Sequence, residues 1–233
     1  MSKLEFRKLR ADEIECRISI CNEYGVGLLL YKDARCDQNI LDETVGATNW
    51  QRHHSRDNAN CIVSIWDSEK EQWIEKEDTG KESFTEKEKG LASDSFKRAC
   101  FNWGIGRELY TAPNMFVNPK DLKTYNQVAK DKWTCRDTFK VTHIEYEEDK
   151  ICYVRVENQK TKKHIDFGTP ASILKITNSK INDVKVESLE QRCVNDGVNV
   201  DKVLKHFKVE KLADLTEKQL SILNQYWDSF KEA

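Results

Sequence analysis

The chain has 233 residues, three prolines and a formal net charge of -2 at pH 7; 38% of its residues are apolar and 33% are charged. This composition describes a folded globular protein with one good core and a small second unit. It excludes a globally basic field, so any nucleic-acid binding must depend on a local patch. The longest apolar run is too short to span a bilayer, and the N-terminus lacks the apolar core of a signal peptide, so we expect a cytoplasmic protein.

The first part of the chain predicts two short helices around an apolar run. Ile14 and Ile18 recur at helical spacing and predict a helix over residues 13–22, after which the run GLLLY follows. A second apolar stripe predicts a helix over residues 34–44 that stops at Gly46.

Three segments of strand character come next, over residues 50–56, 61–67 and 73–79. Gly80 then leads into a long helix. The first half of the chain is therefore predicted to be α+β, with a long helix packed on an antiparallel three-stranded meander.

This long helix is the most informative stretch of the sequence. Thr85 and Glu88 fit a capping box at its start, while Gly104 and Gly106 provide a stop at its end. Its apolar side chains share one stripe, which we expect to face the core. They are Ala92, Phe96, Ala99, Cys100 and Trp103.

The opposite side of the helix carries Lys87, Asp94, Lys97, Arg98 and Phe101. A lysine next to an arginine, together with an aromatic side chain, suits contact with a nucleic-acid backbone. The alternative is a solvated charged face, which is the ordinary explanation for such a pattern.

Eight cysteines are scattered along the chain, and none belongs to a C-x-x-C pair. Several lie in apolar patterns, where a free thiol packs as a small hydrophobe, so we expect reduced cysteines and no metal site. His53 and His54 would point to opposite faces of a strand and are not expected to share an ion.

Beyond residue 113, alternating apolar and polar residues predict a second antiparallel meander over residues 139–147, 151–158 and 163–167. It would either extend the first sheet or pack beside it. Three lysines in the turn before its last strand form either an outer DNA-binding rim or a plain polar turn. They are Lys160, Lys162 and Lys163.

The end of the chain predicts a small helical bundle after a weakly patterned linker. We expect three helices between residues 186 and 230, with a break at Asn195-Asp196-Gly197 and a cap at Thr216. The predicted organisation is a β-β-β-α core, a β-meander extension, a linker and a small helical domain. These segments span residues 1–113, 114–170, 171–185 and 186–233 respectively.

Two motifs resemble the Rad-fifty-two superfamily of single-strand annealing proteins. The stretch LYKDARCDQNILDETVGATNW is similar to the start of that family's core, where an extended piece with an arginine leads into a short helix, a glycine and a tryptophan. The stretch ASDSFKRACFNWGIGRELY resembles the family's signature helix, and the expected meander lies between the two. The ending WGIGRELY is closer to the bacteriophage and bacterial recombinase branch. The resemblance covers residues 12–113, about half of the chain.

The resemblance implies a binding protein, not an enzyme, that anneals complementary strands in homologous recombination and DNA repair without ATP or a cofactor. Family members form rings or helical filaments and hold single-stranded DNA in a basic groove, with phosphates against the protein and bases exposed. The absence of a G-x-x-x-x-G-K-[ST] loop agrees with this. The expected partners are single-stranded DNA, further copies of the chain, and a single-stranded-DNA-binding protein or exonuclease at the C-terminal helices. The expected setting is a bacterial or phage-infected host cell.

The resemblance also implies binding roles for named residues. Arg35 matches the arginine after the family's first extended segment, and Lys97 and Arg98 match the Lys-Arg pair of the signature helix. All three are expected to contact the DNA backbone, for which guanidinium and ammonium groups are suited. Four further cations flank the helix and are weaker candidates, with a solvated side chain as an equal alternative. They are Lys81, Lys87, Lys89 and Arg107.

Phe101 departs from the family pattern, because eukaryotic members carry a basic residue at this position. Its ring either stacks on or between bases or contacts a neighbouring protomer. We favour the protomer contact, since annealing requires the base faces to stay accessible.

Two other functions remain open at this point. A related module would coat and protect single strands or DNA ends without efficient annealing. A metal-dependent nuclease is the less favoured alternative: Glu75 and Glu77 would share one face of a strand and could hold Mg²⁺, although such pairs are common on solvated edges.

Overall fold

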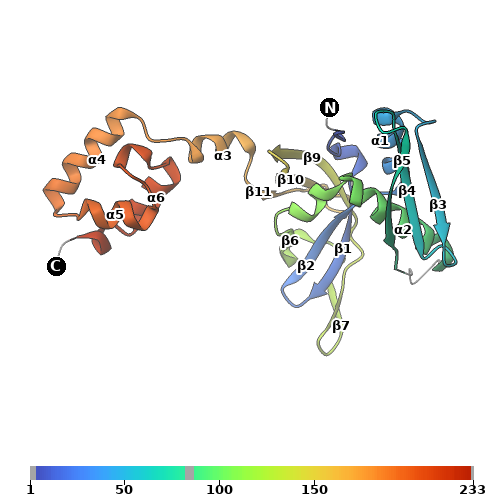
Figure 1. Cartoon of the computed structure of the whole chain (residues 1–233). Coiled ribbons are helices and arrows are strands. Elements are labelled where there is room, and N and C mark those ends of the chain that lie inside the picture. Colours follow the sequence, from blue (N-terminus) through green and yellow to red (C-terminus); the bar gives the residue numbers. More distant parts are fainter. Residues whose placement is uncertain (1–3, 82–86, 232–233) are drawn as a thin grey trace. The chain divides into compact units, whose positions relative to one another are not determined.

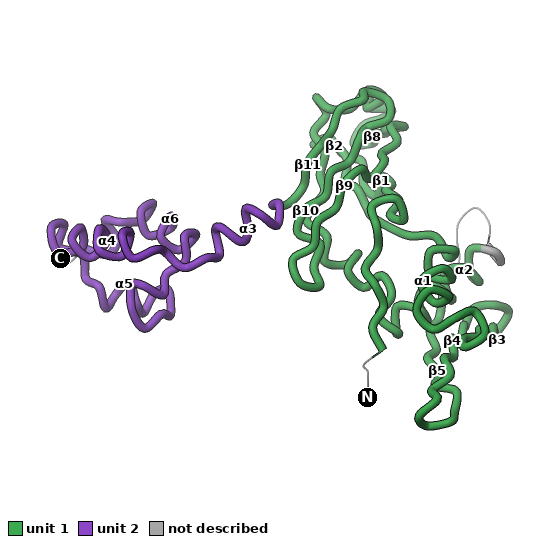
Figure 2. Tube along the Cα trace, turned by 90° about the horizontal axis from the view of Figure 1, so that it is seen from above, with its two compact units in different colours: residues 1–168 green, residues 169–233 purple. Residues whose placement is uncertain are grey.

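The computed structural model describes residues 4–81 and 87–231 and confirms the α+β class. The chain divides into two compact units, Met1–Gly168 and Thr169–Ala233 (Figure 2). Each unit has a hydrophobic core of its own. None of the described helices combines the length and apolar character needed to cross a membrane.

The larger sheet of the first unit has six antiparallel strands in the order β11-β10-β9-β1-β2-β6 (Figure 1). They are β1 (Glu15–Asn22), β2 (Gly25–Tyr31), β6 (Phe116–Val117), β9 (Phe139–Glu147), β10 (Lys150–Asn158) and β11 (His164–Gly168). Strands β9 to β11 confirm the predicted second meander. It pairs with β1 and not with the first meander, so that it lies beside that sheet.

The predicted helix over residues 13–22 is wrong, because this segment forms β1. Ile14 is buried, and Cys16 and Ile18 pack against the same core. These three residues are spaced by two, so the apolar residues that fit a helical stripe also line one face of a strand. Antiparallel pairing with the apolar strand β2 decides between the two conformations.

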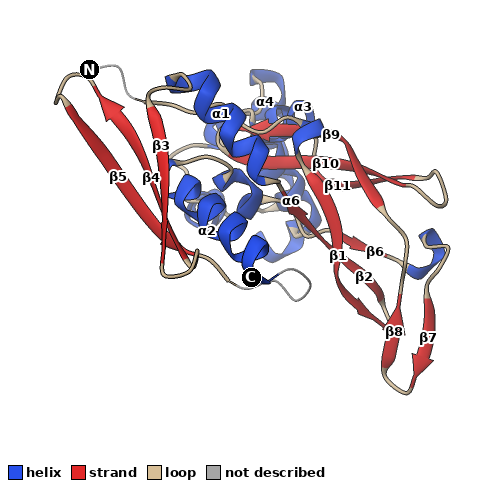
Figure 3. Ribbon diagram, turned by 90° about the vertical axis from the view of Figure 1, so that its right-hand side faces the viewer, coloured by secondary structure: helices blue, strands red, loops and turns tan. Residues whose placement is uncertain are grey.

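The smaller sheet is the predicted first meander, and a long helix covers one of its faces (Figure 3). The elements are α1 (Ala34–Val45), β3 (Trp50–Ser55), β4 (Asn60–Asp67), β5 (Gln72–Thr79) and α2 (Lys87–Trp103). Phe96, Ala99 and Cys100 of α2 are buried, as the apolar stripe predicts, and the Trp103 indole donates a hydrogen bond to the Val63 carbonyl of β4. The predicted capping box of Thr85 and Glu88 lies outside the described side chains.

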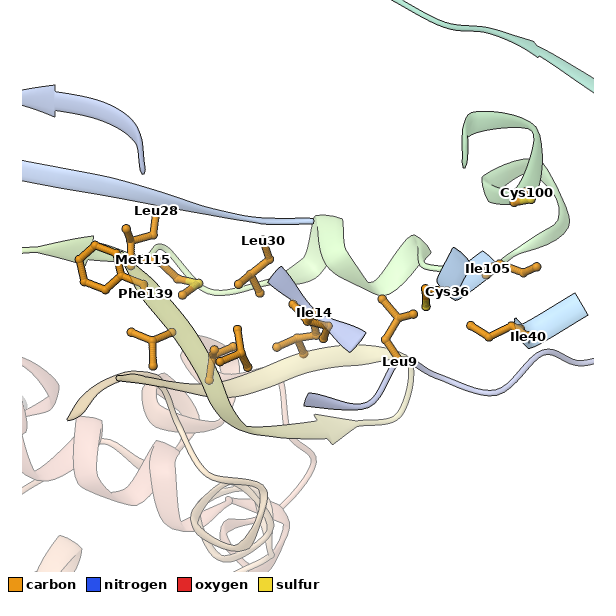
Figure 4. Packing of buried hydrophobic residues seen from close by; sticks show 14 of the residues in the cluster. Leu9, Ile14, Leu28, Leu30, Cys36, Ile40, Cys100, Ile105, Met115 and Phe139 are labelled. Atoms are coloured by element: carbon orange, nitrogen blue, oxygen red, sulfur yellow. The ribbon is translucent and has the colours of Figure 1, made fainter. Parts of the chain in front are cut away.

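One hydrophobic core joins both sheets of the first unit. Figure 4 shows Leu28 and Leu30 of β2 with Phe139 of β9, and farther along the same cluster Ile40 of α1 and Cys100 of α2. The predicted core and its meander extension therefore share one interior.

The sequence pattern did not predict a third sheet, the hairpin of β7 (Asn126–Ala129) and β8 (Lys132–Thr134). This hairpin projects past the β1–β2 turn (Figures 1 and 3). Its strands are short and largely polar, so they carry none of the apolar alternation that marks longer strands.

The second unit contains α3 (Ala171–Asn178), α4 (Asp183–Asp196), α5 (Val200–Phe207) and α6 (Glu217–Gln225). Helices α4 to α6 confirm the three predicted helices; Gly197 ends α4 in the left-handed conformation, and Thr216 caps α6. The stretch predicted as a linker is mostly helical instead, since it contains α3 and the first turn of α4. Its pattern is weak because α3 exposes Ile173 and Ile176.

Gly25→Ala is expected to destabilise the first unit more than Gly104→Ala does. Both glycines have positive φ, which strains any other residue by about 1–3 kcal/mol. A Cβ at position 25 would also lie 2.1 Å from the backbone oxygen of Val117, whereas position 104 has open space. Denaturant unfolding of both variants measures the difference, and equal losses in the free energy of unfolding would contradict the predicted clash with β6.

Candidate nucleic-acid interface

Helix α2 carries the predicted Lys-Arg pair, but the two side chains diverge, as neighbours about 100° apart on a helix must. The Arg98 Nε donates to Asp78 Oδ1 of β5 at 3.2 Å. Lys97 makes no side-chain hydrogen bond or ion pair with another described residue. Its charge acts on Asp37 of α1: burial raises the pKa of that carboxyl, and the charges of Lys32 and Lys97 oppose the rise. The pair therefore straddles α2, with Arg98 on the β5 side and Lys97 on the α1 side.

Arg35 lies in the first turn of α1, held by the residue that caps the helix. Asp33 accepts a hydrogen bond from the Cys36 backbone N–H at 2.9 Å through one oxygen and from Arg35 Nε at 2.8 Å through the other. The Arg35 side chain is nevertheless 84% exposed. Because Nε makes its hydrogen bond within the chain, the outer guanidinium nitrogens face solvent and can meet a phosphate.

A buried ion pair lies beneath this surface. The Lys32 ammonium, just after β2, contacts both carboxylate oxygens of Asp37, and both residues are almost fully buried. Gly106, in the turn after α2, packs on the Lys32 side chain so closely that a Cβ would lie 2.3 Å from Lys32 Cε. The pair thus joins the end of β2, helix α1 and the turn after α2. No pattern in the sequence indicates that either charge is buried.

The C-terminal end of α2 carries a cluster of one cation and two aromatic rings. The Arg107 guanidinium donates to the carbonyls of Phe101 and Asn102, both at 2.7 Å, and so helps to cap the last turn of the helix. It also lies 5.7 Å from the Phe101 ring centroid. Tyr110, which is 79% exposed, meets Phe101 edge to face with 5.0 Å between centroids. Phe101 is therefore partly covered by its own chain.

The other three weaker candidates lie at the opposite end of α2 from Arg107. Lys81 is exposed in the turn after β5, and its backbone N–H donates to Asp94 at 2.8 Å. Lys87 and Lys89 belong to the first turn of α2, but their side chains lie outside the described part of the chain.

The candidate residues fall into two groups. Lys97 and Phe101 are one helical turn apart and share a side of α2, with Arg107 packed on Phe101. Arg35 lies on α1, a helix that contacts α2. Arg98 lies apart from them, on the side that faces β5.

Two further cations near α2, which the sequence analysis did not single out, make internal contacts. The Lys76 ammonium donates to the Asn102 carbonyl at 2.9 Å and lies 4.4 Å from the Trp103 ring centroid. The Arg52 guanidinium lies 4.8 Å from the centroid of Phe96. Both positions therefore stabilise the packing of α2 on the sheet.

The acidic pair considered for Mg²⁺ has polar neighbours of its own. Glu75 accepts a hydrogen bond from Ser64 at 3.3 Å, and Glu77 accepts one from Asn60 at 2.6 Å. Within the described ranges, no group of three or more His, Cys, Asp or Glu side chains is placed to hold a metal ion. All eight cysteines are free thiols.

Comparisons with protein-family models, with curated proteins and with solved structures found no match for this chain.

Proposed function

We propose that this protein binds single-stranded DNA and anneals complementary strands as a homo-oligomeric ring or filament, independently of ATP, in recombination and repair. The observation that carries the proposal is the side of α2 formed by Lys97, Phe101 and Arg107, with the exposed Arg35 on the adjoining helix. These cations are concentrated locally on a chain whose net charge is -2. The two sequence motifs that resemble the annealing family lie in α1 and α2, the same elements.

The chemistry of this surface suits phosphates more than bases. Arginine can grip a phosphate with two parallel hydrogen bonds, and lysine adds a mobile point charge. Each phosphate that is neutralised releases condensed counterions, which supplies most of the binding free energy at low salt. Because Phe101 is engaged by Tyr110 and Arg107, a strand held here by its phosphates keeps its base faces accessible to a complementary strand.

A protective single-strand coat is the second candidate, and the exposure of Tyr110 favours it. A ring that is 79% exposed beside Arg107 offers a stacking platform for a base. A base stacked there would be hidden from a second strand. Tyr110 therefore contributes to single-strand binding if the protein coats the strand, and contributes little if the protein anneals strands.

The test is to mix the full-length protein with two complementary dye-labelled oligonucleotides, without ATP or metal, and to follow their pairing over time. We expect pairing faster than the spontaneous rate, and an equal rate for Tyr110→Ala because the phosphates carry the contact. Tight binding without acceleration, weakened by Tyr110→Ala, would instead establish the coat. Failure to bind single strands at low salt would overturn both.

The proposed setting is the cytoplasm of a bacterial or phage-infected cell. The helical second unit is proposed to dock a single-stranded-DNA-binding protein or an exonuclease, since small appended helical units commonly serve as docking modules.

A further inference from the structure

A second concentration of positive charge lies on the β7–β8 hairpin and its flanks, residues 120–136, here called the basic arm. This stretch contains five lysines and arginines against two aspartates. All five cations are exposed, and none makes a side-chain hydrogen bond or ion pair with another residue in the described part of the chain. They are Lys120, Lys123, Lys130, Lys132 and Arg136.

The arm is held firmly at its base. Tyr125 stacks on Trp133 with 4.9 Å between ring centroids, and its hydroxyl donates to the Asn22 carbonyl at the end of β1. The buried Asp137 accepts hydrogen bonds from the Lys123 and Thr124 backbone N–H groups and from the Thr124 hydroxyl. Burial alone would raise the pKa of Asp137, but these hydrogen bonds and that of Asn158 outweigh it and hold the pKa below its usual range. The anchor is therefore charged and fully engaged at neutral pH.

Successive side chains of β8 point to opposite faces, so that Trp133 packs toward Tyr125 while its neighbour Lys132 faces away. Lys130 precedes the tight turn at Asp131, where φ is +58°. The projecting tip (Figure 3) thus presents two lysines on a narrow ribbon of backbone.

The arm also adjoins the lysine-rich turn between β10 and β11. Lys163 Nζ lies 3.2 Å from Asp121 Oδ1, and Asn158 donates to the Asp121 carbonyl at 3.1 Å. One of the two carboxylates of the arm is therefore already paired. Of the other two lysines in this turn, Lys162 pairs with Glu157 at 3.2 Å and Lys160 is exposed.

We propose that the basic arm is a second nucleic-acid-binding surface, which holds phosphodiester backbone independently of α2. A two-stranded ribbon fits the major groove of a duplex, about 12 Å wide, and lysines at its tip and base would reach the flanking phosphates. The same cations would track the phosphates of a single strand. The choice of nucleic acid over an acidic protein as the partner rests on the proposed function. The charge and the rigidity of the arm are properties of the structure and are independent of that proposal.

The test uses the full chain with Lys130→Glu and Lys132→Glu together, and measures its affinity for a labelled single strand and a labelled duplex of equal length over a range of salt concentrations. We expect the affinity for at least one of these probes to fall about tenfold or more at moderate salt. The slope of log affinity against log salt should become shallower by about 1.8 for duplex or about 1.4 for single strand, from two lost phosphate contacts. The probe that responds identifies the strand form that the arm holds.

The matched control carries the same change of charge at two exposed lysines outside the arm, Lys150→Glu with Lys205→Glu, and should keep the wild-type slope. The charge-preserving variant Lys130→Arg with Lys132→Arg should keep wild-type affinity. Equal affinity and slope for the arm and control variants would overturn the proposal, and so would loss of binding in the arginine variant, because charge would then not be the cause.

The two proposals fail separately. If the wild-type protein does not accelerate annealing, but the arm variant has a shallower salt slope than the wild type, the arm proposal is upheld and the annealing proposal is overturned. Accelerated annealing with an unchanged slope in the arm variant would do the reverse.

Discussion

Replacing Lys97 and Arg98 by alanine together is expected to lower the affinity for single-stranded DNA about 10- to 100-fold at moderate salt. A loss of this size corresponds to two charge-assisted contacts to phosphate, each of ordinary strength. The slope of log affinity against log salt should fall by about 1.4, since each single-strand phosphate contact contributes about 0.7. Fluorescence anisotropy of a labelled oligonucleotide over a salt series measures both quantities, and the annealing assay should lose its acceleration in parallel.

The double variant should remain folded, which makes its loss of binding interpretable. The Arg98–Asp78 contact is partly exposed and contributes about 1 kcal/mol or less, and Lys97 has no hydrogen bond or ion pair to a described side chain. The exchange Lys97→Arg with Arg98→Lys keeps both charges and should keep most of the affinity. Asp78→Asn gives a change in the opposite direction, because it releases Arg98 from a competing carboxylate and should tighten binding. Unchanged affinity in the alanine variant across all salt concentrations would contradict the assignment of this pair.

The elements from residue 50 to residue 103 were predictable because their patterns are unambiguous. In strand β4 the buried apolar residues Cys61, Val63 and Ile65 are spaced by two, and α2 repeats its apolar residues at helical spacing. Such patterns decide secondary structure locally, before any tertiary contact is known.

Strand β1 was missed because its pattern fits two periods at once. Ile14 and Ile18 are four residues apart, which suits a helix, and Cys16 between them completes a strand face. Only the partner strand β2 and the distant strand β9 resolve this, and neither pairing is visible in the local sequence. Long-range contacts of this kind override local periodicity.

The candidate site was predictable in its residue types but not in its geometry. The sequence places Lys97 beside Arg98, and only the packing of α2 shows that one faces α1 and the other β5. The role of Arg107 in capping α2 could not be predicted either. The cation that binds the last carbonyls of a helix does not lie at a fixed number of residues from the helix end. The basic arm was missed for a simpler reason: its lysines belong to a hairpin too short to show a strand pattern.

The Lys32–Asp37 pair was also beyond sequence reasoning, and the largest effect on stability is expected there. Asp37→Asn should lower the free energy of unfolding by about 3–5 kcal/mol, because it leaves the Lys32 ammonium buried without a counter-charge. Asp166→Asn is the matched control: it removes the carboxylate of an ion pair with Arg155 that is about half exposed on both sides, and it should cost little. Denaturant unfolding of the two variants compares the same chemical change in a buried and an exposed setting.

A double variant, Lys32→Met with Asp37→Leu, separates the cost of an unpaired charge from the value of the pair itself. Apolar residues of similar volume often replace a buried ion pair without loss of stability. We therefore expect the double variant to be more stable than Asp37→Asn, although it has lost both charges. If the double variant lost as much free energy of unfolding as Asp37→Asn, shape and not charge would be what this position requires. If the double variant folds but binds single strands less tightly than the wild type, the ion pair also serves to hold α1, and with it Arg35, in the position from which it meets a phosphate.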